Sequence, residues 1–382
     1  MIMDDPSKHR VLTLLNALKE ASKELQINTN SNPLSFLFKT DSKPAIDALL
    51  DLETKALATF STDPNLRNIS HSLCSLRTLI EKLDKYQGYG LRSLLRRHLT
   101  NYKISQLARS IESQIQSYID RVTVRDLVKT LQEPCGEEEQ VKALVEFQQR
   151  LSQGFDLGFQ DLVLRAKVFT LLECMLFEPL SSKRVKEEAA MAIAALVKFN
   201  KNVFVGLVLM GPTIKALIAM ASSCSLRVLS SLVRFIRSPL VDEILCNGEI
   251  PTIIGFLCSN DLGLRVAALD CVLELGYIGR REVVEEMLQR DLIKILMELQ
   301  RRGCCCEESD DDVEKNREND DYEAAFSGCV SRFAIQVEVG EGLSPEEKRE
   351  VKLDMLRRVK EASHSDAEAA TVSAEILWGS SP

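Results

Sequence analysis

The sequence is poor in glycine, proline and aromatic residues. Its 382 residues include 17 Gly and 11 Pro, well below the roughly 7 % and 5 % of ordinary proteins. This scarcity excludes turn-rich β-sandwiches, collagen-like repeats and disorder along the whole chain. Hydrophobic residues make up 45 % of the chain but aromatic residues only 5 %, so most apolar side chains are aliphatic. We therefore expect an all-α fold.

Groups that carry chemistry are also scarce. The four histidines are far apart in the sequence, no Cys-x-x-Cys pair occurs, and neither a Gly-x-Ser-x-Gly elbow nor a phosphate-binding glycine pattern is present. Cys304, Cys305 and Cys306 are adjacent, and thiolates on neighbouring residues cannot all point at one tetrahedral ion. We expect no catalytic residue, no metal and no cofactor, and hence a protein that is not an enzyme.

Negative charge is concentrated in one segment. Residues 307–323 contain ten acidic and two basic side chains, which accounts for the whole net charge of −8. The rest of the chain is neutral, so nucleic-acid binding, which requires a basic surface, is not expected. A segment this acidic cannot bury enough apolar surface to order itself. We interpret residues 303–328 as an acidic disordered linker.

A local excess of positive charge precedes the centre of the chain. Residues 91–129 contain eight basic and three acidic side chains, and the candidate basic patch consists of Arg92, Arg96, Arg97, Lys103 and Arg109. Three interpretations remain open: a solvated helix face, a contact with a phosphate-rich membrane or an acidic partner, and a docking site for the acidic linker.

Localisation signals point to a reducing compartment. Residues 1–6 lack the basic and apolar regions of a signal peptide, which favours the cytoplasm or the nucleus. The apolar stretch 202–226 is interrupted by Gly211, Pro212 and Lys215, so a membrane span is not expected. Lipidation of the three adjacent cysteines is an alternative that would permit peripheral membrane association. The other cysteines in apolar helical patterns are expected to be small buried hydrophobes: Cys174, Cys224, Cys246, Cys258 and Cys271.

Internal repeats are the strongest signal in the sequence. Residues 189–196, 229–236 and 268–275 begin 40 and 39 residues apart, and their first, fourth, fifth and eighth positions are mostly apolar or small. This spacing places those positions on one helix face. A second apolar helical pattern follows each block, in residues 211–220, 248–257 and 290–299. The sequence therefore predicts a helical-repeat solenoid.

The repeats resemble the armadillo family. Gly248-Glu249-Ile250-Pro251-Thr252-Ile253 is similar to the Gly-x-Ile-Pro-x-Leu helix of that family, and the small-residue blocks resemble its third helix. The resemblance covers residues 183–299, and residues 123–131 and 138–151 look like the opening repeat of plant U-box and armadillo proteins. It implies an armadillo-type right-handed α-solenoid. No stretch has the strand and hairpin pattern of a U-box, so ligase activity by this chain alone is not expected.

The expected organisation has four parts. Residues 1–120 contain amphipathic runs at 10–25, 44–60, 66–85 and 91–119 and are expected to form a helical bundle. Residues 121–302 hold the armadillo repeats, and the acidic linker follows. Residues 329–382 are expected to form a short strand, at 329–339, and a charged helical tail.

The resemblance also implies a binding surface, because armadillo third helices line a concave groove that holds an extended peptide. The third and seventh positions of the three blocks are the candidate groove residues: Met191, Ala195, Ser231, Phe235, Asp270 and Glu274. They lack the Trp and Asn series of peptide-binding relatives, so recognition of basic import signals is not expected. Asp270 and Glu274 either hold a basic residue or form the solvated side of a helix.

These observations favour a non-enzymatic scaffold or adaptor that binds a peptide segment of a partner protein. Two alternatives stay open. One is a peripheral membrane adaptor that uses residues 91–129 or the three adjacent cysteines. The other is a substrate-binding or regulatory subunit of a ubiquitin ligase whose catalytic domain lies on another chain.

Overall fold

The computed structural model describes residues 12–13, 15–23, 64–85, 91–133, 136–304 and 325–378, and every regular element in these ranges is a helix. The expected helix at 44–60 and nearly all of the acidic linker lie outside them. Contacts divide the chain into two units. The N-terminal unit comprises residues up to 126 together with 156–166, and the solenoid unit comprises 127–155 and 167–382.

The N-terminal unit is built around two helices, α3 (Pro64–Lys85) and α4 (Leu91–Gln132). Residues 15–21 contribute Leu15, Leu18 and Ala21 to a shared aliphatic core, whose other buried members are Ile69, Leu73, Leu76, Ile80, Ile104, Ala108, Ile111 and Ile115. The short helix α6 (Leu157–Arg165) groups with this unit. Helix α4 runs without a break past residue 120, where the sequence analysis placed the end of the bundle.

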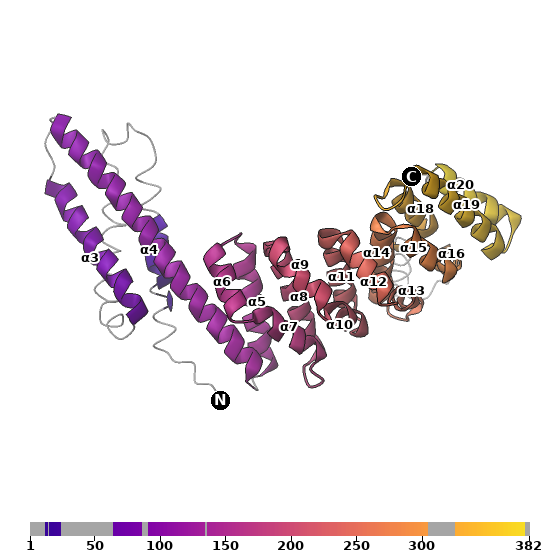
Figure 1. Ribbon diagram of the computed structural model, residues 1–382, viewed down its shortest axis with the longest axis horizontal. Coiled ribbons are helices and arrows are strands. Elements are labelled where there is room, and N and C mark those ends of the chain that lie inside the picture. Colours follow the sequence, from indigo (N-terminus) through magenta and orange to yellow (C-terminus); the bar gives the residue numbers. More distant parts are fainter. Residues whose placement is uncertain are drawn as a thin grey trace, which may run out of the picture. The chain divides into compact units, whose positions relative to one another are not determined.

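The solenoid unit is a row of packed helices (Figure 1). Its elements are α5 (Glu137–Ser152), α7 (Val168–Phe177), α8 (Lys183–Phe199), α9 (Lys201–Met210), α10 (Thr213–Ala219), α11 (Ser223–Ile236), α12 (Ser238–Cys246), α13 (Ile250–Gly255), η2 (Phe256–Cys258), α14 (Leu262–Ile278), α15 (Arg281–Gln289), α16 (Leu292–Cys304), α18 (Cys329–Val339), α19 (Pro345–Ala362) and α20 (Asp366–Trp378). Helices α9–α11 and α12–α14 are two successive three-helix repeats. The third helices form a continuous layer, because α5 packs on α8, α8 on α11, α11 on α14 and α14 on α18.

The three predicted blocks lie in α8, α11 and α14, and their repeated apolar face is buried. The buried positions are Ala189, Ala192, Ile193, Leu196, Leu229, Leu232, Val233, Ile236, Ala268, Cys271, Val272 and Leu275. Each of these helices also begins with a side-chain cap: Ser182, Ser222 and Asp261 accept hydrogen bonds from backbone N–H groups three residues later. The capping residues recur at the same spacing as the blocks, so the third helix begins at the same position in each repeat.

The prediction of a short strand at 329–339 is wrong, because these residues form helix α18. The alternation of Val330, Arg332 and Ala334 with other residue types resembles a strand. The buried set, however, includes Cys329, Phe333 and Val337, which are four residues apart and share one helix face. Packing of that face on α14 and α16 decides in favour of the helical period.

The C-terminal segment continues the solenoid. Arg301 of α16 donates hydrogen bonds to the Glu368 carboxylate (Nε–Oε1 2.6 Å) and to the Ala362 carbonyl oxygen (2.7 Å), and the bond from Arg301 lowers the pKa of Glu368. Arg358 of α19 donates to the Leu288 carbonyl oxygen at 2.7 Å. The acidic segment therefore separates the second and third helices of one repeat, where the preceding two repeats have turns of three residues.

The predicted burial of the cysteines is confirmed for Cys271 only. Burial raises the pKa of its thiol to about 12, so this group stays neutral in the core. Cys174, Cys246 and Cys258 are exposed and Cys224 is half-buried. A solenoid is thin, so its first and second helices, which contain Cys174, Cys246 and Cys258, keep one side in solvent even where their pattern is apolar.

Helices α9 and α10 occupy the apolar stretch that the sequence analysis considered as a membrane span. In the described ranges, no single helix combines the length and apolar content needed to cross a membrane. Helices α9 and α10 reach that length and apolar content only when taken together, and the pair is bent by 68° at the break between Met210 and Thr213.

The contact between α14 and α18 depends on a glycine. A Cβ atom on Gly276 would lie 2.8 Å from Cε2 of Phe333 and 3.3 Å from Cγ2 of Val337. The loop after α18 makes an equally close backbone contact, since the Glu341 N–H donates to the Tyr277 carbonyl oxygen at 2.8 Å. The absence of a side chain at Gly276 therefore sets how closely α18 approaches the preceding repeat.

Replacing Gly276 by Ala is expected to lower the free energy of unfolding by about 1–3 kcal/mol, because the methyl group overpacks the α14–α18 contact. Gly206 in α9 is the matched control, since a Cβ atom there meets nothing within 4 Å. Gly206→Ala should stabilise the chain by roughly 0.5–1 kcal/mol through its helix propensity. Chemical denaturation of both variants is the measurement, and equal stabilisation by both would contradict the close approach.

Candidate interaction surface

The six candidate groove residues lie on three neighbouring third helices. Met191 and Ala195 are on α8, Ser231 and Phe235 on α11, and Asp270 and Glu274 on α14. All are half-buried except Phe235, which is 39 % exposed. We call the solvent-facing side of α5, α8, α11, α14 and α18 the third-helix face. The structure thus places the predicted residues on adjacent helices of one layer.

Polar and cationic side chains connect one third helix to the next. Gln148 of α5 donates to the Glu188 carboxylate of α8 (Nε2–Oε2 2.9 Å). The Lys198 ammonium of α8 lies 5.3 Å from the centre of the Phe235 ring of α11, which is within the range of a cation–π interaction. Lys198 is not among the residues predicted from the sequence, because the eight-residue block ends at Leu196, before the last residues of α8.

Glu274 already has a cationic partner. Arg234 of α11 donates to its carboxylate, with Nε and Oε1 2.5 Å apart. A basic residue of a binding partner would therefore have to displace Arg234. Asp270 takes no part in an ion pair within the described ranges. Of the two carboxylates, Asp270 is the one open to a new cationic or N–H donor.

An aromatic residue lies at or shortly after the C-terminal end of each of four successive third helices. Phe155 follows α5, Phe199 ends α8, and Phe235 and Tyr277 lie in the last turns of α11 and α14. Phe155 and Phe199 are in contact, with ring centres 5.5 Å apart. We call these four residues the aromatic edge. Phe199, Phe235 and Tyr277 each lie within one residue of a helix end, so alignment by helix end, in place of block position, would have revealed these three in the sequence.

Cations accompany the aromatic edge. Lys198 and Arg234 lie in the last turns of α8 and α11, and Arg237 directly follows α11. Positive charge at these places is favourable, because helix C-termini carry the negative end of the helix dipole. Arg237 also forms an ion pair with Glu341 at 3.3 Å, and the Tyr277 hydroxyl donates to the same carboxylate at 3.4 Å. From α8 to α14, aromatic rings and charged groups therefore alternate along one border of the face.

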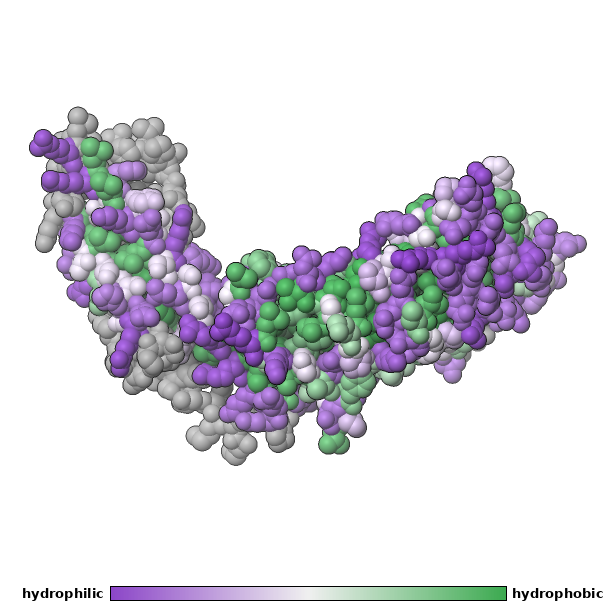
Figure 2. Space-filling model, viewed as in Figure 1, coloured by the Kyte–Doolittle hydropathy of each residue, from purple (hydrophilic) through white to green (hydrophobic). Residues whose placement is uncertain are grey.

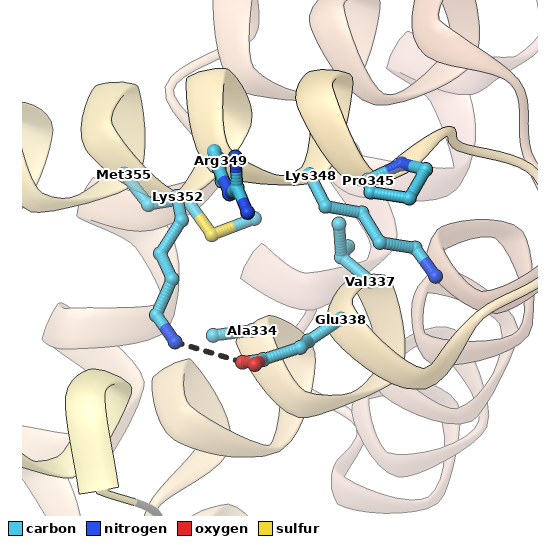
Figure 3. A pocket seen from close by; sticks show the side chains of 8 residues that line it. All are labelled: Ala334, Val337, Glu338, Pro345, Lys348, Arg349, Lys352 and Met355. Carbon is cyan, nitrogen blue, oxygen red and sulfur yellow. Dashed lines mark hydrogen bonds and ion pairs between the residues drawn. The ribbon is translucent and has the colours of Figure 1, made fainter.

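A small pocket of about 270 Å³ lies between α18 and α19 (Figure 3). Ala334, Val337 and Met355 form its apolar part. Two of its cations are engaged, since Lys352 pairs with Glu338 at 2.8 Å and Lys348 donates to the Gly340 carbonyl oxygen at 2.7 Å. These bonds hold α19 against α18, and we assign the pocket a structural role.

The candidate basic patch belongs to the N-terminal unit, whereas the third-helix face belongs to the solenoid unit. Arg92, Arg96, Lys103 and Arg109 are exposed on α4, and the side chain of Arg97 lies outside the described set. Of the three adjacent cysteines, Cys304 ends α16 and the other two are not described. Among the side chains that the structure describes, no three of His, Cys, Asp or Glu come close enough together to hold a metal ion.

Comparison with known proteins returns solved structures only. No family model and no curated protein matches the sequence. An engineered protein from the Northeast Structural Genomics Consortium is 15 % identical, with a TM-score of 0.45 over 67 % of this chain and 97 % of that one. Designed armadillo repeat proteins are 16 % identical over 66 % of this chain, with TM-scores of 0.42; one covers 98 % of its own chain, and another, in complex with the peptide (KR)4, covers 97 %. Scores this low carry no argument, so the solenoid assignment rests on the chain's own helices.

The Arg234–Glu274 pair supplies a test of the helix-to-helix contacts. A double-mutant cycle to Ala should give a coupling energy of roughly 0.2–1 kcal/mol, because both side chains reach solvent, and this coupling should fall at high salt. The control cycle pairs Arg227, an exposed residue earlier on α11, with Glu274 and should give no coupling. Equal coupling in the two cycles would show that the contact does not form.

Proposed function

We propose that this protein is a non-enzymatic scaffold that binds an extended segment of a partner protein across the third-helix face. The observation that carries the proposal is the aromatic edge, with one aromatic residue at or just beyond the end of each of four neighbouring helices and with cations at the ends of α8 and α11. Aromatic and Arg side chains dominate protein interfaces because they bury a large area and still make polar contacts. A regular series of them on an exposed face suits recognition of a chain that is itself regular.

The spacing of the repeats fits an extended polypeptide. Packed helices lie about 8–10 Å apart, and an extended chain advances about 3.3 Å per residue. One repeat therefore corresponds to about three residues of the partner, and the four steps from α5 to α18 to about 12 residues. A ligand of that length would meet each aromatic residue of the edge in turn.

The face also has groups that can satisfy a peptide backbone and orient its side chains. Gln148 and Ser231 can donate and accept hydrogen bonds, and Asp270 offers an unpaired carboxylate to an N–H group or a cation. Met191 is a flexible apolar contact beside them, of the kind that adapts to different partner side chains. We infer a ligand with apolar residues for the aromatic edge and at least one donor for Asp270.

A peptide selection tests this function. Peptides of about 12 residues, selected from a random displayed library on the full chain, should bind Phe235→Ser about tenfold more weakly, which corresponds to about 1.4 kcal/mol. The reason is that Phe235 lies at the centre of the edge, where loss of an aromatic contact has the largest effect. Fluorescence anisotropy of the selected peptides gives the affinities.

Leu207→Ser on α9 is the matched control, because Leu207 is 40 % exposed and Phe235 39 % while only Phe235 is on a third helix. The control variant should bind the peptides as tightly as the unchanged chain. Equal loss in both variants, or no loss in Phe235→Ser, would place the binding surface elsewhere.

A further inference from the structure

The first half of α4 exposes three large apolar side chains. Leu95, Leu99 and Tyr102 are 64 %, 58 % and 59 % exposed. Their spacing of four and three residues places them on one stripe of the helix. Figure 2 shows hydrophobic atoms bordered by hydrophilic ones along this end of α4. The amphipathic run at 91–119 predicted a helix with one apolar face, and this second, exposed apolar stripe is visible only in the structure.

The stripe lies on the side of α4 that the core does not use. The core of the N-terminal unit takes Ile104, Ala108 and Ile111, which an ideal helix of 3.6 residues per turn places opposite Leu95 and Leu99. The helix thus has two apolar faces. One is buried in its own unit and the other is presented outwards.

Cations border the outward stripe on both sides. At about 100° per residue, Arg92, Arg96 and Lys103 follow one flank, and Arg109 lies on the other; all four are exposed. Residues 91–111 contain five Lys or Arg and no Asp or Glu. The local charge is therefore entirely positive over about 30 Å of helix, at 1.5 Å per residue.

We propose that this stripe docks the protein on an anionic membrane surface. An apolar stripe between cationic flanks is the pattern of a helix that lies in the plane of a lipid interface. Leu95 and Leu99 would enter the boundary of the acyl chains, and Tyr102 would lie at headgroup level with its hydroxyl in the polar layer. The Arg and Lys stems extend alongside the apolar residues and carry their charges to the lipid phosphates.

Charge complementarity selects a lipid surface over an acidic polypeptide. An acidic peptide would be matched by a single row of cations, whereas here Arg109 adds positive charge on the flank opposite Arg92 and Lys103, which suits a broad negative surface. Attraction of this kind falls off within a Debye length, about 8–10 Å at ordinary salt. The docking is thus reversible and sensitive to salt.

Vesicle sedimentation with the full chain tests the proposal. The chain should bind phosphatidylcholine vesicles that contain about 30 % phosphatidylserine, and it should not bind vesicles of neutral phosphatidylcholine alone. A Leu95→Ser, Leu99→Ser, Tyr102→Ser variant should bind the anionic vesicles at least tenfold more weakly. An Arg92→Ser, Lys103→Ser variant should lose affinity too, and its remaining binding should depend less on salt.

Two controls separate this proposal from the peptide-binding function. The Leu207→Ser and Phe235→Ser variants should bind vesicles as the unchanged chain does, and the stripe variants should still bind the selected peptides. Circular dichroism of each variant confirms that the helices are retained. Equal binding to neutral and anionic vesicles, or full binding by the stripe variant, would overturn the proposal. Binding to polyglutamate without binding to anionic vesicles would also overturn it and would identify an acidic protein as the partner.

Discussion

The packing of each third helix on the next is the interaction on which the solenoid depends. Helices α8, α11 and α14 bury the same apolar face, and no single repeat has enough apolar surface to form a core by itself. Small residues keep the helices close: Ala189 and Ala192 are fully buried in α8, and Gly276 admits the Phe333 ring. Stability is therefore shared between neighbours along the row.

This packing also explains how the acidic segment is accommodated. The segment lies between α16 and α18, yet α18 still packs on α16, and the Cys329 thiol donates to the Leu296 carbonyl oxygen at 3.1 Å. Lengthening the connection between two helices adds little to the entropy cost of closing the loop, because that cost grows only with the logarithm of loop length. Contacts on both sides of the insertion are enough to keep the repeat together.

The two proposed binding surfaces differ in chemistry because their helices are packed differently. The third-helix face belongs to helices that pack on both neighbours, so its exposed residues are held in register and alternate between aromatic and charged types. The stripe on α4 belongs to a helix with its core on one side only, which leaves the other side apolar and basic. The first arrangement suits an extended peptide and the second a flat anionic surface, so the two proposals attribute separate tasks to separate units.

The sequence by itself determined the helical class and the repeat register. The helical period can be read directly from the three blocks, 189–196, 229–236 and 268–275, because the residues of a buried helix face must recur every three to four positions. Only tertiary packing decided that 329–339 is a helix, since its alternating pattern is compatible with both periods until α14 and α16 cover one face. The contacts of Phe235 with Lys198 and of Arg234 with Glu274 were likewise decided by the structure. These contacts join residues about 40 positions apart. They depend on how two neighbouring helices are aligned along their length, and the sequence of either helix alone does not show that alignment.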